Sequence, residues 1–73
     1  MRTATFWGKL IRQLREEHGV SEREIGRRTG IGRTTLRRIE AGGRTSIDKL
    51  EKLLSALGYE LDAIKREGGQ DAL

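Results

Sequence analysis

The short link at Gly30 is the feature that most limits how this chain can fold. Ser21 begins one helical pattern, with Glu24 three residues later completing a capping box, and residues 33–41 carry the next pattern. Only three or four residues around Gly30 separate the two predicted helices, and so short a link forces them to cross sharply. Gly30 permits the positive φ of such a turn, and Gly26 leaves room for a close approach of the helix backbones.

A further helix is predicted on each side of this pair. Residues 6–18 carry apolar residues at helical spacing, and Gly19 after them suits a left-handed C-terminal cap. Thr45 or Ser46 caps the last helix, whose apolar stripe ends at Gly58. We therefore predict an all-α fold of four to five short helices. The residues expected to face its core are Trp7, Ile11, Leu14, Ile25, Ile31, Leu36, Ile39, Ile47, Leu50, Leu53, Leu54 and Leu57. Phe6 and Leu10 exceed what the inner face of the first helix needs and are candidates to cover a dimer or partner surface.

Residues 59–66 fit two different structures. Apolar residues alternate with acids at Tyr59, Leu61 and Ala63, which favours a strand, whereas Leu61 and Ile64 are spaced as in a fifth helical turn. We favour the strand, which needs a partner strand, most simply from a second copy of the chain. These four residues are therefore the candidate dimer contacts. The predicted organisation is an N-terminal arm at 1–5, a domain at 6–58, a dimerisation segment at 59–66 and a flexible tail at 67–73.

The positive charge of the chain is concentrated in its middle. Residues 23–44 hold seven arginines against two glutamates, while the whole chain of 73 residues has a net charge of +4. The planar guanidinium group suits phosphates and guanine edges better than the ammonium group of lysine does. So one-sided a block of positive charge on so small a domain indicates that the protein binds a polyanion, and that the block is not merely a solvated helix face.

The composition excludes several classes of function. The chain has no Cys and a single histidine, His18, so disulfides, thiolate metal sites and most triad chemistry are excluded. It has neither a glycine-rich phosphate loop nor a cluster of metal ligands, and we expect no enzyme, no cofactor and no bound metal. We expect a protein of the cytoplasm, associated with the nucleoid, that does not enter a membrane. With 34% apolar and 4% aromatic residues, the core is thin for an isolated monomer and favours a dimer or another partner.

One long segment resembles a known family. The stretch VSEREIGRRTGIGRTTLRRIEAGGRTSIDKLEKLLSALG is similar to the phage-repressor and Cro-like (XRE-type) helix-turn-helix domain. The apolar spacing, the Ile39-Glu40 pair, Gly42 and the ending ALG at 56–58 all occur in register, and the resemblance spans about residues 7–58. It implies that the helix beginning at Arg33 is a recognition helix that lies in the major groove of double-stranded DNA.

The resemblance also implies which residues meet the DNA. Contacts with base edges fall on Arg33, Thr34 and Arg38, with Arg37 beside them as either a base or a phosphate contact. Phosphate contacts are expected from Arg15, Glu22, Arg23, Gly32, Thr35 and Arg44.

Three of the positions depart from the family pattern. Glu22 stands where the family commonly has Gln, so its carboxylate either pairs with Arg23 or another arginine or accepts a hydrogen bond from a cytosine. Thr29 replaces an apolar residue and should have its hydroxyl bonded inside the helix. Gly32 replaces the usual Ser or Thr cap, which weakens the start of the recognition helix by a few tenths of a kcal/mol.

The resemblance further implies an ion pair between Arg15 and Glu40. It would link the first helix to the end of the recognition helix and hold Arg15 toward a phosphate. We expect an exposed pair, which contributes little to stability, so that its role is to orient Arg15.

The function predicted is a sequence-specific regulator of transcription that binds double-stranded DNA, a dimeric autorepressor on a palindromic operator. Two alternatives stay open. The ending ALGYELDAI resembles antitoxin members of the family, which repress their own operon and bind a toxin. A protein-interaction module that keeps the helix-turn-helix fold is the other alternative.

Overall fold

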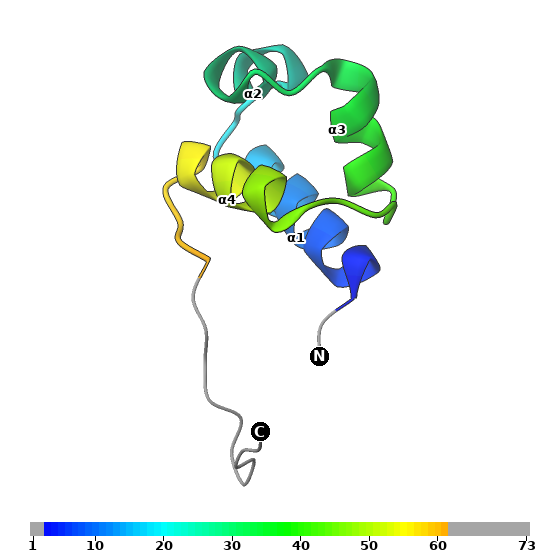
Figure 1. The fold of residues 1–73 in the computed structure, drawn as a ribbon. Helices are drawn as coiled ribbons and strands as arrows, with labels where there is room; N and C mark the ends of the chain where they lie inside the picture. The colour runs from blue at the N-terminus through cyan, green and yellow to red at the C-terminus, as the bar shows by residue number, and fades with distance from the viewer. Residues whose placement is uncertain (1–2, 62–73) are drawn as a thin grey trace, which may run out of the picture.

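The computed structural model describes residues 3–61, and this part of the chain forms four helices and no strand (Figure 1). The helices are α1 (Ala4–Glu17), α2 (Glu22–Thr29), α3 (Arg33–Glu40) and α4 (Ile47–Ala56). The predicted all-α fold is confirmed. Predictions for Ala63, Ile64 and the tail at 67–73 lie outside the described residues. No helix within 3–61 combines the length and the apolar character needed to cross a membrane.

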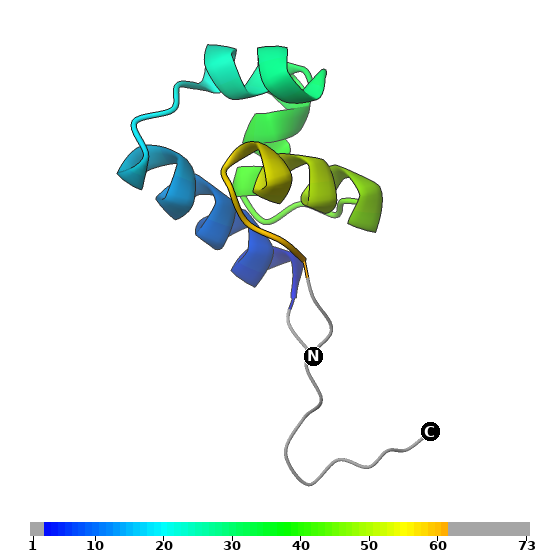
Figure 2. The same cartoon turned by 90° about the vertical axis from the view of Figure 1, so that its left-hand side faces the viewer.

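The four helices pack around one core, and the helices that pack together are not always neighbours along the chain. Helix α1 packs against α3 and α4, and α2 packs against the same two helices. Figures 1 and 2 show α3 running from α2 toward the first turns of α1, with α4 lying across the middle. The buried side chains at the centre are Ile11, Leu14, Ile25, Ile31, Leu36, Ile39, Leu50, Leu53, Leu54 and Leu57, with Trp7, Leu10, Val20, Ala56 and Leu61 packed at their margin.

The prediction of the core is wrong for one residue. Ile47 is 62% exposed although it continues the apolar spacing of α4. It is the first residue of that helix, directly after the Ser46 cap, whose hydroxyl accepts from the Lys49 N–H at 3.2 Å. Periodicity identifies the inward face of a helix but not how far the neighbouring helices extend along it, so an end position can share the face and remain uncovered.

The N-terminal arm is shorter than predicted, because α1 begins at Ala4. The Thr3 hydroxyl accepts a hydrogen bond from the Phe6 N–H at 3.2 Å and so caps the helix. Residues 4 and 5 therefore belong to α1 and not to an arm. The helix ends at Glu17, and Gly19 follows with a φ of 65°, the left-handed conformation expected of it.

Residues 59–61, the described part of the segment predicted as a strand, form neither a strand nor a helix in the single chain. The Tyr59 N–H donates to the Leu54 carbonyl at 2.8 Å, and Gly58 before it has a φ of 92°, so the chain turns back to close the end of α4. Leu61 packs at the margin of the core of its own chain and is half-buried, so its part in a dimer contact stays a prediction.

Gly8 is the point where two helix backbones come closest. A Cβ atom at Gly8 would lie 2.1 Å from the Ile39 carbonyl oxygen and 3.2 Å from the Glu40 carbonyl. Any side chain at this position would therefore push α1 away from the last turn of α3. One turn earlier, Thr5 contacts the turn that follows α3, where a Cβ at Gly42 would lie 3.1 Å from the threonine hydroxyl. The absence of a side chain at Gly8 thus sets the distance between α1 and α3.

Replacing Gly8 by alanine should destabilise the protein by about 1–3 kcal/mol, because the new methyl group overpacks a contact made by backbone atoms that cannot move aside. Urea unfolding followed by circular dichroism measures the change. Gly32→Ser is the matched control, since a Cβ there meets nothing within 4 Å and the new hydroxyl can cap α3. Equal stability of Gly8→Ala and the wild type would refute the account of this contact.

Candidate nucleic-acid interface

Helix α3 has one buried face and one face covered with cations. Leu36 and Ile39 are buried in the core, while Arg33, Thr34, Arg37 and Arg38 are exposed. With 3.6 residues per turn, these four side chains occupy the side of the helix opposite the two apolar ones. The structure thus brings the predicted base contacts together on one surface of one helix.

The turn between α2 and α3 is held by hydrogen bonds within a few residues. Gly30 has a φ of 78° and donates its N–H to the Gly26 carbonyl at 2.8 Å. The Thr29 hydroxyl donates to the Ile25 carbonyl at 2.7 Å and accepts from the Ile31 N–H at 3.1 Å, so the expectation of a bonded hydroxyl is confirmed. A Cβ at Gly26 would lie 3.1 Å from the Ile31 carbonyl oxygen, so the close approach predicted there is made by the turn itself.

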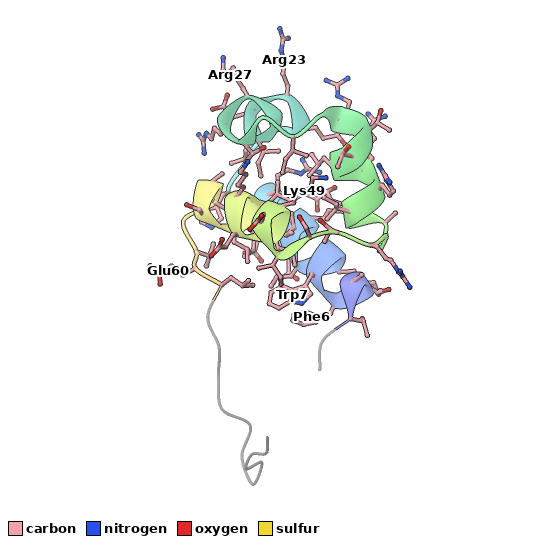
Figure 3. All side chains as sticks on the ribbon, viewed as in Figure 1. Phe6, Trp7, Arg23, Arg27, Lys49 and Glu60 are labelled. Atoms are coloured by element: carbon pink, nitrogen blue, oxygen red, sulfur yellow. The ribbon has the colours of Figure 1, made fainter. Side chains whose placement is uncertain are left out.

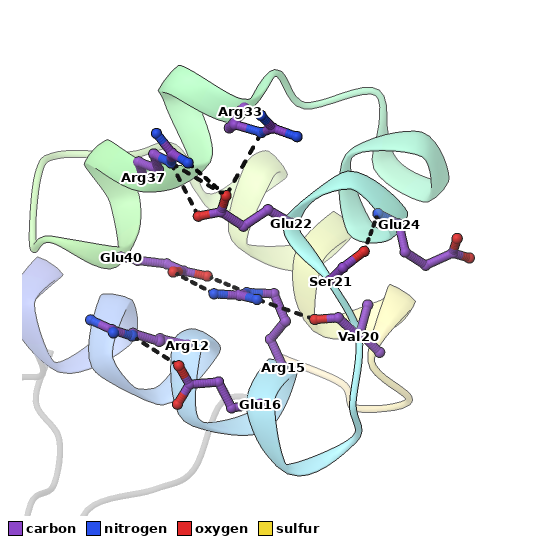
Figure 4. A network of polar contacts seen from close by, with 10 residues as sticks. All are labelled: Arg12, Arg15, Glu16, Val20, Ser21, Glu22, Glu24, Arg33, Arg37 and Glu40. Atoms are coloured by element: carbon purple, nitrogen blue, oxygen red, sulfur yellow. Dashed lines mark hydrogen bonds and ion pairs between the residues drawn. The ribbon is translucent and has the colours of Figure 1, made fainter.

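Glu22, the first residue of α2, points across to α3 (Figure 4). Its carboxylate accepts from Arg37 Nη2 at 3.0 Å and from Arg37 Nε at 3.1 and 3.3 Å, and it lies 3.7 Å from Arg33 Nε. The hydrogen bonds from Arg37 hold the pKa of Glu22 below its ordinary value of 4.5, and the same contact raises the pKa of Arg37. Of the arrangements left open for Glu22, the free protein thus adopts an ion pair with arginines of α3.

Glu24 lies in the same first turn of α2 but pairs within its own helix. Its carboxylate accepts from Arg28 Nε at 2.8 Å and also from Arg27, and the bond from Arg28 is the main cause of its lowered pKa. Its backbone N–H donates to the Ser21 hydroxyl at 3.0 Å, so the predicted cap at Ser21 is present while the carboxylate is engaged with arginines. Arg28 also donates to the Ala56 carbonyl at 3.1 Å and so ties α2 to the end of α4.

Two cations of α2 project away from the body of the molecule. Figure 3 shows Arg23 and Arg27 pointing outward from the side of α2 that faces away from α1, whereas Phe6 and Trp7 lie at the opposite end. Arg23 is exposed, which leaves it accessible for the phosphate contact predicted for it. Arg23 and Arg27 therefore lie far from Phe6 and Trp7.

The side chains of Arg15 and Glu40 form a two-bonded ion pair between α1 and α3 (Figure 4). Arg15 Nε lies 2.8 Å from Glu40 Oε2, and Arg15 Nη2 lies 3.1 Å from Glu40 Oε1. Arg15 Nη1 also donates to the Val20 carbonyl at 3.2 Å. The side chains are only 11% and 8% exposed, so the expectation of an exposed pair is wrong. The bonds to Glu40 are the main reason that the pKa of Arg15 lies above its ordinary value.

The remaining predicted contacts flank α3. Gly32 is its N-cap and gives no side-chain hydrogen bond, and Thr35 in the first turn is half-buried. A Cβ at Gly43 would lie 2.7 Å from Arg38 Cγ, so the stem of Arg38 leans over the turn that follows its helix. Arg44 is exposed in the loop between α3 and α4.

One cation beside this surface was not singled out from the sequence. Arg12 stands on α1 and pairs with Glu16 at 3.2 Å. It lines a shallow hollow of about 280 Å³ together with Arg15, Glu22, Arg37, Glu40 and Ala41. Its position one turn before Arg15 on the same helix was the available signal, since residues three apart share a helix face.

A model of the helix-turn-helix family matches residues 11–64, which is most of the chain. The chain belongs to this family. The resemblance to the XRE type of this family is thereby confirmed, and the chain is a DNA-binding helix-turn-helix protein. A comparison with curated proteins found no significant match.

The Arg15–Glu40 pair of this helix-turn-helix protein should contribute to its stability. Removing either charge leaves the other buried and unpaired, so Arg15→Met and Glu40→Gln should each lower the free energy of unfolding by about 1–3 kcal/mol. The arginine variant should lose more, because the Val20 carbonyl also loses its donor.

The double variant should cost less than the sum of the two single variants, because the second substitution removes a charge that is already unpaired. Urea unfolding of the four proteins measures this coupling. Strictly additive losses would contradict a direct ion pair.

The stability of the protein should fall in acid through the carboxylates at the start of α2. The pKa values of Glu22 and Glu24 in the folded protein lie below the ordinary 4.5, so their ion pairs stabilise the fold above that pH. The stabilisation is lost as the pH falls through the lowered values.

The loss of unfolding free energy between pH 6 and pH 3 should therefore be smaller for the Glu22→Gln, Glu24→Gln double variant than for the wild type. An equal loss in the two proteins would contradict the lowered pKa values.

Proposed function

We propose that this protein is a sequence-specific regulator of transcription that represses by binding an operator in double-stranded DNA through α3. The observation that carries the proposal is the exposed face of α3, where Arg33, Thr34, Arg37 and Arg38 stand together directly after a sharp turn. A helix fits the major groove of B-form DNA, and a helix that follows such a turn can enter it with its first residues.

The residues on this face have separate roles in the proposal. Arg33 and Arg38 bind guanine O6 and N7 through two hydrogen bonds each, and Thr34 contacts a neighbouring base by its hydroxyl or methyl group. Arg37 contacts a base or a phosphate with the part of its guanidinium that Glu22 does not hold. Arg23, Gly32, Thr35 and Arg44 position the helix by contacting phosphates. Arg15, held by Glu40 and Val20, reaches a phosphate with its remaining N–H groups.

Two copies of the chain are proposed to bind one operator. A single recognition helix reads too few bases for high specificity, and two copies related by a two-fold axis read half-sites about 34 Å apart. Tyr59, which is 40% exposed, and Ile47 on α4, which is 62% exposed, offer apolar surface for such a contact. Occupation of an operator that overlaps a promoter then excludes RNA polymerase.

Selection of bound fragments from a pool of random duplexes tests this proposal directly. The expected outcome is a recurring sequence with two-fold symmetry and affinity that falls steeply with salt. Recovery of no duplex at any salt concentration would refute the proposal. Binding of an acidic protein with no duplex bound would instead assign the surface to protein interaction.

Variants of single arginines separate base contacts from phosphate contacts. Arg33→Ala and Arg38→Ala should each weaken binding to the selected duplex by about 1–3 kcal/mol, since each removes two hydrogen bonds to a base. Their effect on a random duplex of the same length should be much smaller. Arg44→Ala should weaken both duplexes alike and reduce the slope of log affinity against log salt by about 1.

Lys52→Ala, which removes an exposed cation from α4, is the control for charge alone. Fluorescence anisotropy with labelled duplexes measures all four variants. If Arg33→Ala and Arg38→Ala weakened the selected and random duplexes equally, the assignment of base contacts would be wrong.

A further inference from the structure

An anion stands inside the surface proposed to meet DNA. The Glu22 carboxylate lies 3.0 Å from Arg37 Nη2 and 3.7 Å from Arg33 Nε, and its side chain is 26% exposed. It comes from α2 while both arginines come from α3 (Figure 4). A negative charge in this place opposes the approach of any phosphate, so stronger attraction to DNA cannot be its effect.

We propose that Glu22 is a positioning residue that sets sequence specificity, by holding Arg37 and Arg33 and by penalising contacts made through phosphates alone. The inference rests on the proposed function of α3. It assigns to Glu22 neither a contact with a phosphate nor one with a cytosine, but an action on DNA through two arginines.

The penalty differs between phosphates and bases for an electrostatic reason. A phosphate that approaches Arg37 carries a full negative charge and meets the carboxylate already bound there, so the two anions repel each other. Guanine O6 and N7 are acceptors on a neutral base. Arg37 Nη1, which makes none of the bonds to Glu22, can donate to such an acceptor while the carboxylate stays in place. Non-specific binding depends almost entirely on phosphates and therefore bears most of the penalty.

The geometry also fixes the aim of the arginines. An arginine side chain loses much of its rotamer freedom when it is ordered. The bonds that Arg37 makes with Glu22 restrict the side chain before DNA arrives, so less of that entropy is lost on binding. The restriction favours a ligand whose acceptors fit the existing arrangement, and it gives no advantage to a ligand that needs another one.

A simpler role for Glu22 would be to stabilise the start of α2 by its charge. Glu24 provides the matched comparison, because it lies in the same first turn, is 30% exposed and also pairs with arginines. Its partners Arg27 and Arg28 belong to α2 and not to α3. An effect of helix charge alone would be shared by both glutamates, whereas control of the arginines of α3 belongs to Glu22.

The experiment compares Glu22→Gln and Glu24→Gln with the wild type on two probes: the duplex selected by the wild type and a random duplex of the same length. Glu22→Gln should bind the random duplex about three- to tenfold more tightly at low salt. The slope of its log affinity against log salt should steepen by about 0.9, because one more phosphate is neutralised. Affinity for the selected duplex should change by less than about twofold. The specificity ratio, which is the affinity for the selected duplex divided by that for the random duplex, should therefore fall. Glu24→Gln should leave that ratio within about twofold of the wild type.

A second comparison tests whether Glu22 acts through Arg37. In an Arg37→Met background, the gain of Glu22→Gln on random DNA should shrink to the part that Arg33 can supply. Circular dichroism of each variant checks that the fold is retained.

Two outcomes would overturn the inference: an equal gain on both duplexes, or no gain on the random duplex. Failure of the wild type to bind any duplex would refute the proposed function of α3, and this inference with it. Normal wild-type binding with an unchanged ratio in Glu22→Gln would refute the inference alone.

Discussion

The contact between the first half of α1 and the last turn of α3 determines how the rest of the domain presents itself. At Gly8 the two backbones approach so closely that a Cβ atom would lie 2.1 Å from the Ile39 carbonyl oxygen. Two turns further along α1, the Arg15–Glu40 pair joins the same helices with two hydrogen bonds. The close contact fixes the separation of the helices and the ion pair fixes their rotation. Helix α3 therefore packs on α1 with one face, and its opposite face carries only polar and cationic side chains.

The features that could be predicted from the sequence are those decided by a few neighbouring residues. Gly30 fixes a turn because its conformation is open to few other residues, and Leu36 and Ile39 are buried because helical spacing places them together. What could not be predicted depends on the distances between helices. In the sequence, Gly8 cannot be told from any other glycine in a helix, because its role depends on the Ile39 backbone that packs against it. Ile47 fits an apolar stripe although no neighbour covers it.

The partners of charged side chains were the hardest feature to predict from the sequence. Glu22 has arginines within a few residues of it along α2, yet it pairs with Arg37, fifteen positions away. The choice follows from the crossing of α2 and α3, which brings the start of one helix beside the exposed face of the other. The Arg15–Glu40 pair was expected from the resemblance, but its burial was not, because burial depends on how closely α1 and α3 pack.

The acids of this small domain divide its arginines into groups with different freedom. Glu40 immobilises Arg15 where water is largely excluded, Glu24 keeps Arg27 and Arg28 within α2, and Glu22 holds one side of the face of α3. Thr34 and Arg38, on the other side of that face, have no carboxylate within ion-pair distance among residues 3–61, and Arg44 in the following loop is likewise open. A polyanion that contacts only Arg38 and Arg44 would be attracted by their charge, but both side chains would lose rotamer freedom on binding. A polyanion that also contacts the paired arginines would bind side chains that folding has already ordered, so less entropy would be lost on binding.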